Sequence, residues 1–216
     1  MIDEQTEKRP GSFWRELPIL VGVAILVAVL VRAFVLQTFY IPSPSMEHTL
    51  NVLDRVLVNK LVYDFREPRR GEIVVFKAPA DWQTGTEGED FIKRIIGVGG
   101  DHVVCCDNEQ RLIVNGHALA EPFIYRDADG VQDPAADEPF DITVPADRLW
   151  VMGDHRSQSA DSLEHWQQSE GDITEATVRS DAIVGRAFTI FWPVDRATWL
   201  SVPKEFDAIP ATAPAN

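Results

Sequence analysis

The amino-acid sequence predicts a mainly β protein in which a single N-terminal transmembrane helix precedes an antiparallel β domain. One long apolar segment near the N-terminus and a later series of short Val-, Ile- and Phe-rich runs bounded by turn residues support this fold class. No long amphipathic helix alternates with these runs, which argues against a parallel α/β sheet. The expected organisation is a cytoplasmic tail over 1–16, a transmembrane anchor over 17–36, an extracytoplasmic β-rich domain over 37–205 and a disordered tail over 206–216.

The composition excludes several classes of protein. The 216 residues carry a net charge of −14 without a basic stripe, so nucleic acid is not an expected partner, because phosphate contacts require basic side chains. Two Cys exclude a disulfide scaffold and a multi-cysteine zinc protein. The five His show no metal-ligand spacing, and the glycine of Asp127–Gly130 is misplaced for a calcium loop. No metal or other cofactor is therefore expected.

The apolar segment is interpreted as an uncleaved membrane anchor. No residue from Leu17 to Val31 is charged, and the 20 residues from Leu17 to Leu36, at about 1.5 Å each, span a hydrocarbon core of roughly 30 Å. Arg32, near the far end, can extend its guanidinium to the interface. A cleaved signal peptide would be followed by small residues, and a buried helix would show a polar face; neither pattern is present.

Charge and proline placement orient the chain around this segment. Lys8, Arg9 and Arg15 precede it and only Arg32 follows closely, which puts the N-terminus in the cytoplasm and the rest of the chain outside. The two prolines of Ile41-Pro42-Ser43-Pro44-Ser45 prevent the helix from continuing. Ser45 is therefore expected close to the membrane surface, in an extended segment.

The β pattern begins after Val52. A hairpin is expected over His102–Val114, with its turn at Asp107–Gln110, and the acidic stretch Glu121–Asp172 is expected to form solvated loops. The predicted strands are Val56–Phe65, Ile73–Phe76, Phe91–Val98, Val103–Cys106, Leu112–Val114, Leu149–Met152 and Ala182–Phe191.

Three segments could carry chemistry, although each also has a plain structural interpretation. Ser43 and Ser45 lie in a turn bracketed by prolines, which could be an ordinary linker. Lys93 alternates with apolar residues in a strand, where it could be a protective charge on a sheet edge or an amine whose pKa burial lowers. The small polar residues at 152–162 could form only a turn, or could orient a base.

Taken together, these segments resemble an ordered set of sequence blocks in type I signal peptidases, which are membrane-bound Ser/Lys endopeptidases. The blocks are I-P-S-P-S-M-E-H-T-L at 41–50, D-R-V-L-V-N-K at 54–60, R-G-E-I-V-V-F at 70–76, F-I-K-R-I-I-G-V-G-G-D at 91–101 and G-D-H-R-S-Q-S-A-D-S at 153–162. The order of five blocks, covering nearly the whole chain after Leu17, is more specific than any one of them.

The resemblance implies a role for each matching residue. It implies that Ser45 is the nucleophile, that Lys93 is the general base, and that the Ser45 N–H and the Ser43 hydroxyl form the oxyanion hole. It further implies that a serine hydrogen-bonds the lysine amine with an aspartate beside it, and that an ion pair joins two blocks. These supporting positions are Ser159 and Asp161, and Asp154 and Arg94.

The sequence departs from the family pattern at several positions. His48 replaces the usual Pro of the first block, and His155 replaces the usual Asn of the last. Leu163 stands where an Arg usually pairs with Asp161, and Arg156 is the candidate substitute for that Arg. For the adjacent Cys105-Cys106 pair, free thiols and one labile disulfide are both open, because neighbouring Cys bridge only with strained geometry.

The resemblance also implies the partners and the location. Signal peptides of exported pre-proteins would be the substrates, cut at the outer face of the cell membrane, with the lipid bilayer as a partner and the protein translocation channel as a further candidate. A Ser/Lys self-cleaving repressor would share the chemistry, but it needs a DNA-binding helix pair, and this chain has a predicted membrane span instead. Two alternatives stay open: an inactive paralogue, and a membrane-tethered β domain that only binds a partner.

Overall fold

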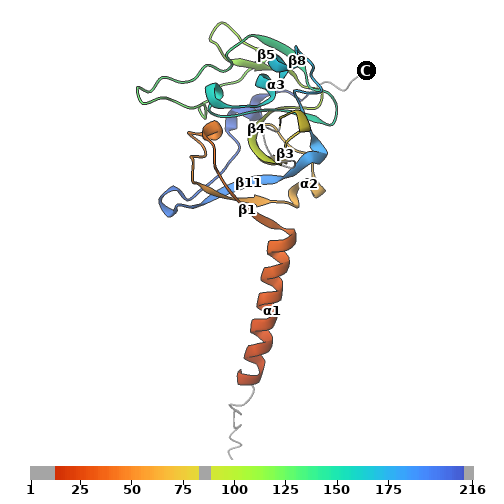
Figure 1. Cartoon of the computed structure of the whole chain (residues 1–216), viewed down its shortest axis with the longest axis vertical. Helices are drawn as coiled ribbons and strands as arrows, with labels where there is room; N and C mark the ends of the chain where they lie inside the picture. Colours follow the sequence, from red (N-terminus) through yellow and green to blue (C-terminus); the bar gives the residue numbers. More distant parts are fainter. Residues whose placement is uncertain (1–12, 83–88, 212–216) are drawn as a thin grey trace, which may run out of the picture.

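The computed structural model describes residues 13–82 and 89–211. Helix α1 (Phe13–Phe34) stands apart from a β domain built from two antiparallel sheets (Figure 1). The strands of the larger sheet are β1 (Leu36–Tyr40), β2 (Arg55–Asn59), β3 (Ile73–Lys77), β4 (Asp90–Val98), β9 (Arg148–Met152), β10 (Val178–Arg179), β11 (Ile183–Trp192) and β12 (Thr198–Trp199). They follow the order β1-β2-β11-β3-β4-β9-β10, and β12 pairs with β11.

The smaller sheet has the order β7-β6-β5-β8. Its strands are β5 (His102–Cys105), β6 (Leu112–Val114), β7 (His117–Ala118) and β8 (Phe140–Thr143). The turn of the β5–β6 hairpin is closed by hydrogen bonds between Asp107 and Arg111 and from Gln110 to Asp107, as the sequence predicts. The mainly β, antiparallel fold class is confirmed.

Helix α1 has 22 residues, and the side chains that can be described along it are largely exposed and apolar. The helix ends at Phe34, two residues before the expected limit of the anchor, and Leu36 already pairs with Asn59 in the sheet. Among the described residues, no helix meets the combined length and apolarity that define a candidate membrane span.

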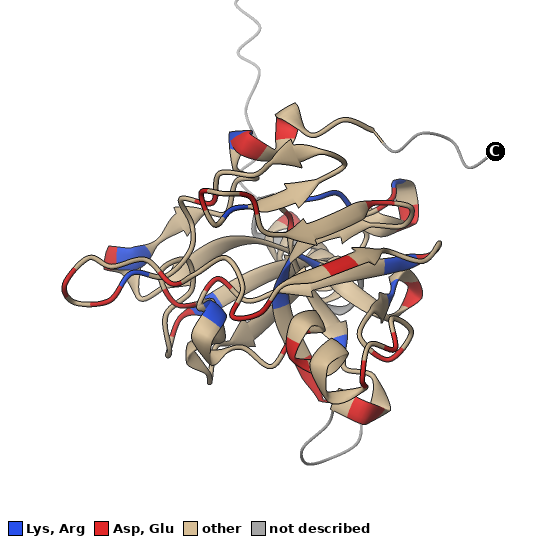
Figure 2. Ribbon diagram, turned by 90° about the horizontal axis from the view of Figure 1, so that it is seen from above, with Lys and Arg blue, Asp and Glu red and all other residues tan. Residues whose placement is uncertain are grey.

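Short helices connect the strands. They include α2 (Val62–Phe65), α3 (Ser162–Gln168) and the 3₁₀ turns η1 (Pro44–Met46), η2 (Ala80–Trp82), η3 (Arg156–Gln158), η4 (Ser180–Ala182), η5 (Val194–Arg196) and η6 (Lys204–Ala208). The predicted strand Val56–Phe65 therefore stops at Asn59 and is followed by α2. Viewed from the end opposite α1, Asp and Glu gather mainly on loops and short helices, as expected of the acidic stretch (Figure 2).

The hydrophobic core fixes the segments around the site. Met46 and Leu50 are buried beneath the serine turn, in a cluster with residues of β2, β3 and β11. Phe206 and Ile209 are buried in the cluster beneath the smaller sheet, because η6 packs the chain back onto the domain. The prediction of a disordered tail from residue 206 is therefore wrong for these residues; residues 212–216 lie outside the described part.

Candidate active site

Ser45 lies in the 3₁₀ turn η1, between β1 and β2. Pro44 suits the first position of this turn because its ring fixes φ near the helical value, and buried Met46 anchors the other end. The hydroxyl oxygens of Ser43 and Ser45 lie 3.4 Å apart. The Ser45 carbonyl accepts a hydrogen bond of 3.1 Å from the backbone N–H of His155. This hydrogen bond and the burial of Met46 in the core together hold the turn in place.

Lys93 lies in β4, opposite Val74 of β3. Because Lys93 is buried, it is not a solvent-exposed protective charge of the kind found on sheet edges. The side chain is 4% exposed, and burial lowers the pKa of Lys93 to about 8, while the carboxylates of Asp161 and Asp154 act in the opposite direction. A large fraction of Lys93 is therefore neutral in weakly alkaline solution.

The serine turn and the lysine strand pack against each other, since η1 contacts both β4 and η3. Within the described residues, the Ser45 hydroxyl bonds only to Ser43, and no hydrogen bond joins it to the Lys93 amine. Catalytic hydrogen bonds are often long without substrate and tighten when it binds. The structure thus brings the serine turn and the buried amine together without joining them directly.

The segment after β9 closes this region. Asp161 is the N-cap of α3, and its carboxylate accepts hydrogen bonds from Gly153 N–H at 2.8 Å and Leu163 N–H at 3.1 Å. A Cβ at Gly153 would collide with the Ser45 carbonyl oxygen and the Ser159 hydroxyl, so only glycine allows this approach. The Ser159 hydroxyl is buried without a hydrogen-bond partner among the described residues.

Arg94 and Asp154 form a buried ion pair with two hydrogen bonds, of 2.8 and 2.6 Å. Arg94 also donates to the Gly71 carbonyl at 3.0 Å, and its guanidinium lies over the Phe123 ring. Thr49, four residues after Ser45, donates to Asp154 at 2.5 Å. The pair therefore ties together the segment that carries the serine, the strand that carries the lysine and the end of β9.

Thr49 was not singled out by the sequence analysis. It lies inside the first sequence block, but a threonine four residues after a serine has no distinguishing pattern of its own.

The departure at Leu163 can be examined directly in the structure. Leu163 is buried in the core cluster beneath the smaller sheet, so its side chain packs against apolar neighbours. Arg156 pairs with Glu121 at 2.5 Å and donates to the Gly153 carbonyl at 2.9 Å. The expectation that Arg156 replaces the missing arginine beside Asp161 is wrong; backbone N–H groups hold Asp161 instead.

The other departures lie near the serine turn or in the smaller sheet. The imidazole Nδ1 of His48 is 3.0 Å from the Phe123 carbonyl oxygen, and His48 has a positive φ of 82°. The backbone of His155 binds the Ser45 carbonyl. Cys105 and Cys106 form a disulfide, which decides between the two redox states that the sequence left open.

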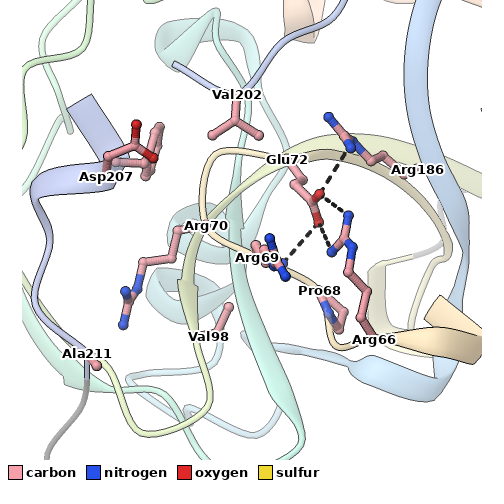
Figure 3. A pocket seen from close by; sticks show the side chains of 11 residues that line it. Arg66, Pro68, Arg69, Arg70, Glu72, Val98, Arg186, Val202, Asp207 and Ala211 are labelled. Atoms are coloured by element: carbon pink, nitrogen blue, oxygen red, sulfur yellow. Dashed lines mark hydrogen bonds and ion pairs between the residues drawn. The ribbon is translucent and has the colours of Figure 1, made fainter. Parts of the chain in front are cut away.

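A cavity of about 560 Å³ lies away from this region, beside the loop that leads into β3 (Figure 3). Its arginines are largely neutralised: Arg66 forms hydrogen bonds of 2.5 and 3.1 Å with Glu72, Arg186 approaches the same carboxylate, and Arg70 binds Asp101. This network holds the turn at Gly71, whose carbonyl receives Arg94. We therefore interpret it as structural support for the candidate site.

The antiparallel β domain therefore carries a serine in a rigid turn, packed against a strand with a buried lysine whose pKa is lowered. This combination is typical of a serine hydrolase that uses an amine as its base. The comparisons with known proteins agree. A family model described as signal peptidase, peptidase S26, matches residues 14–192. The chain belongs to this family, and the prediction from the five sequence blocks is confirmed.

Individual relatives cover most of the chain. The probable signal peptidase I-2 of Synechocystis sp. (strain ATCC 27184 / PCC 6803 / Kazusa) is 36% identical over 206 residues, which cover 95% of this chain and 86% of the relative. Signal peptidase I of Leptolyngbya laminosa is 37% identical, with 86% and 83% covered. Signal peptidase I of Mycobacterium tuberculosis (strain ATCC 25618 / H37Rv) is 34% identical, with 88% and 77% covered.

Proposed function

We propose that this protein removes N-terminal signal peptides from exported pre-proteins, with Ser45 as the nucleophile and Lys93 as the general base. The observation that carries the assignment is the burial of Lys93, which lowers its pKa to about 8 on a strand packed against the serine turn. In the reaction, the neutral Lys93 amine takes the Ser45 proton while Oγ attacks the scissile carbonyl. The resulting ammonium gives that proton to the leaving amine, and the same amine then activates water to hydrolyse the acyl-enzyme.

The Ser43 hydroxyl and the Ser45 N–H would stabilise the oxyanion of the tetrahedral intermediates. The distance of 3.4 Å between the two hydroxyl oxygens supports this role, because an oxyanion formed next to Ser45 Oγ lies within reach of Ser43. The unpartnered hydroxyl of Ser159 is available to orient the Lys93 amine. Asp161 would hold this segment in place through Gly153, and the Arg94–Asp154 pair would fix the strands around it.

The substrate would bind as an added β-strand. From Arg94 onward, β4 pairs with β9, but Asp90–Lys93 pair only with β3 among the described residues. Within residues 13–82 and 89–211, no strand pairs with the second edge of β4 beside Lys93, and an extended peptide can form main-chain hydrogen bonds there. Such binding would bring the scissile carbonyl between the lysine and the serine turn.

The membrane would hold the enzyme beside its substrates. Exposed apolar side chains along α1 support a single-pass anchor, with the N-terminus in the cytoplasm and the β domain outside. Strand β1 follows α1 directly, and the nearby β11–β12 hairpin exposes Trp192, Val194 and Trp199, the last being 73% exposed (Figure 1). Aromatic side chains favour the bilayer interface, so this end of the domain would rest on the lipid. The translocation channel would deliver the substrate.

The test is cleavage of a purified pre-protein by the full chain in detergent micelles. The unmodified protein should cut at one site. The variants Ser45→Ala and Lys93→Ala should abolish the cut and should still show the folded circular dichroism spectrum.

Ser43→Ala should lower kcat by about 10²–10³-fold, and the exposed Ser201→Ala is the matched control. The rate should rise with pH through about 8, as Lys93 loses its proton. Activity in Lys93→Ala would refute the assignment; no cleavage by the unmodified protein would favour an inactive paralogue.

A further inference from the structure

A second cavity, of about 500 Å³, lies where helix α1 meets strands β1 and β2 of the larger sheet. Backbone hydrogen bonds hold this junction together, because the Lys60 N–H donates to the Val35 carbonyl at 2.9 Å and Leu36 pairs with Asn59. The cavity therefore lies at the point where α1 leads into the β domain (Figure 1). In the proposed membrane orientation, lipid headgroups meet the hydrocarbon core at this level.

Part of the cavity wall is apolar. Strand β2 alternates, so that Val56 and Val58 are fully buried in the core, whereas Leu57 points to the opposite face and is half-buried. Val31 of α1 is 38% exposed. The apolar side chains that line the cavity are Ala28, Val31, Leu36 and Leu57. These side chains offer a surface that suits a hydrocarbon chain.

Two basic residues supply the charge of the cavity. Arg32 lies in the last turn of α1, and Lys60 follows the end of β2, so the cations come from the two elements that form the junction. The described lining contains no Asp or Glu, although the whole chain has a net charge of −14. Gln37 and Thr38 add polar groups that can form hydrogen bonds. Basic side chains at the end of a membrane helix attract anionic headgroups, and their long stems can follow an apolar surface.

We propose that this cavity binds one anionic phospholipid, with its phosphate and headgroup at Arg32 and Lys60 and an acyl chain along Ala28 and Val31. Such a lipid matches both parts of the lining, because its negative charge faces two cations and its hydrocarbon covers the apolar wall. Free phosphate would match only the basic part. The inference rests on the proposed membrane anchor and not on the Ser/Lys chemistry. Lipid bound here ties the end of the anchor to β1, the strand that leads to the serine turn.

The test titrates the full chain in neutral detergent micelles with phosphatidylglycerol or with phosphatidylcholine, and native mass spectrometry counts the lipids bound. We expect one phosphatidylglycerol per chain to bind saturably and about tenfold more tightly than phosphatidylcholine. Arg32→Gln and Lys60→Gln should each weaken this binding about fivefold, and together about 25-fold, because each removes one cation from the headgroup. Agreement between the two single variants guards against a local structural change in either one.

Arg55→Gln is the matched control, because it removes the same charge from the other end of β2, outside the cavity. It should bind phosphatidylglycerol as tightly as the unmodified chain. Equal losses in Arg55→Gln and Lys60→Gln would reveal only a diffuse attraction to the surface, and equal binding of the two lipids would remove the selectivity for charge. Glycerol phosphate, a headgroup without hydrocarbon, should bind much more weakly than the lipid, and equally tight binding would reveal a site for free phosphate. Each of these three results would overturn the inference.

Flotation of the full chain with phosphatidylcholine vesicles tests the membrane anchor separately. A chain that does not float would refute the anchor and this inference with it, whereas a floating chain without a preference for phosphatidylglycerol would refute the inference alone. Neither measurement uses a pre-protein. Failure of the proposed peptidase activity is therefore seen independently, as cleavage by Ser45→Ala or none by the unmodified protein.

Discussion

Replacing Lys93 with Met should stabilise the fold while removing the activity. Burial lowers the pKa of Lys93 from 10.5 to about 8, so the folded protein disfavours the ammonium relative to the unfolded chain. The difference of about 2.5 pH units, at 1.36 kcal/mol each, corresponds to about 3 kcal/mol of unfavourable free energy when the lysine is protonated in both states. Methionine has a similar length and carries no charge, so Lys93→Met relieves this cost.

The gain in stability has a defined pH window. The folded-state pKa lies below the unfolded value, so the unfolded state binds more protons between about pH 8 and 10.5, and the stability of the unmodified protein rises with pH across that window. The advantage of Lys93→Met should therefore be fully present below about pH 8 and should vanish above about pH 10.5. Other titrating groups are common to both proteins, and their contributions cancel in the comparison.

Urea unfolding of the full chain in detergent micelles, followed by tryptophan fluorescence, measures this difference. Exposed Lys204→Met is the matched control and should leave the free energy of unfolding nearly unchanged at every pH. If Lys93→Met were destabilising at neutral pH, or if its effect did not depend on pH, Lys93 would be a fully ionised, stabilised side chain. The argument for a neutral amine as the base would then fail.

Three further substitutions test the parts around the dyad. Arg94→Met leaves buried Asp154 without its partner and should cost about 3–5 kcal/mol, seen as a fall of about 6–20 °C in the thermal unfolding midpoint. Gly153→Ala should lower kcat by about 10²-fold and also lower the unfolding midpoint, because its Cβ displaces the Ser45 carbonyl; undiminished cleavage would contradict this placement. Leu163→Arg, which restores the family's usual residue, should destabilise the fold in thermal unfolding without raising the rate of cleavage, since the side chain enters an apolar core.

The longer strands could be predicted because their apolar runs are continuous and end at turn residues. Strand β4 and the β5–β6 hairpin are examples. Strand β1 (Leu36–Tyr40) is not predicted because its residues follow the apolar helix without a break and show no turn residue that would mark a separate strand. Strands β7, β10 and β12 have two residues each, too few to show any periodicity. Burial of Phe206 depends on packing against distant residues, which the local composition of the tail does not reveal.

Some features of the candidate site could likewise be predicted from the sequence, and others could not. Alternation in β4 correctly placed Lys93 among apolar neighbours, but alternation does not show whether a strand is central or at an edge. Arg94 and Asp154 are 60 residues apart, and only the family resemblance paired them. The contacts of His155 with Glu47 and Asp133 join three loops and follow from neither spacing nor resemblance.

Two neighbouring basic residues on β4 are equally buried, but burial has opposite consequences for their charge. Arg94 and Lys93 are 2% and 4% exposed, so both lose nearly all contact with water. Arg94 recovers this loss through hydrogen bonds to Asp154, Thr49 and Gly71, and it stays charged as a structural tie. Lys93 has no hydrogen bond to a described side chain and only the more distant fields of two carboxylates, so its amine can release a proton near pH 8. The absence of a close anionic partner for Lys93 in the part of the chain that the structure describes is therefore what equips it to act as a base.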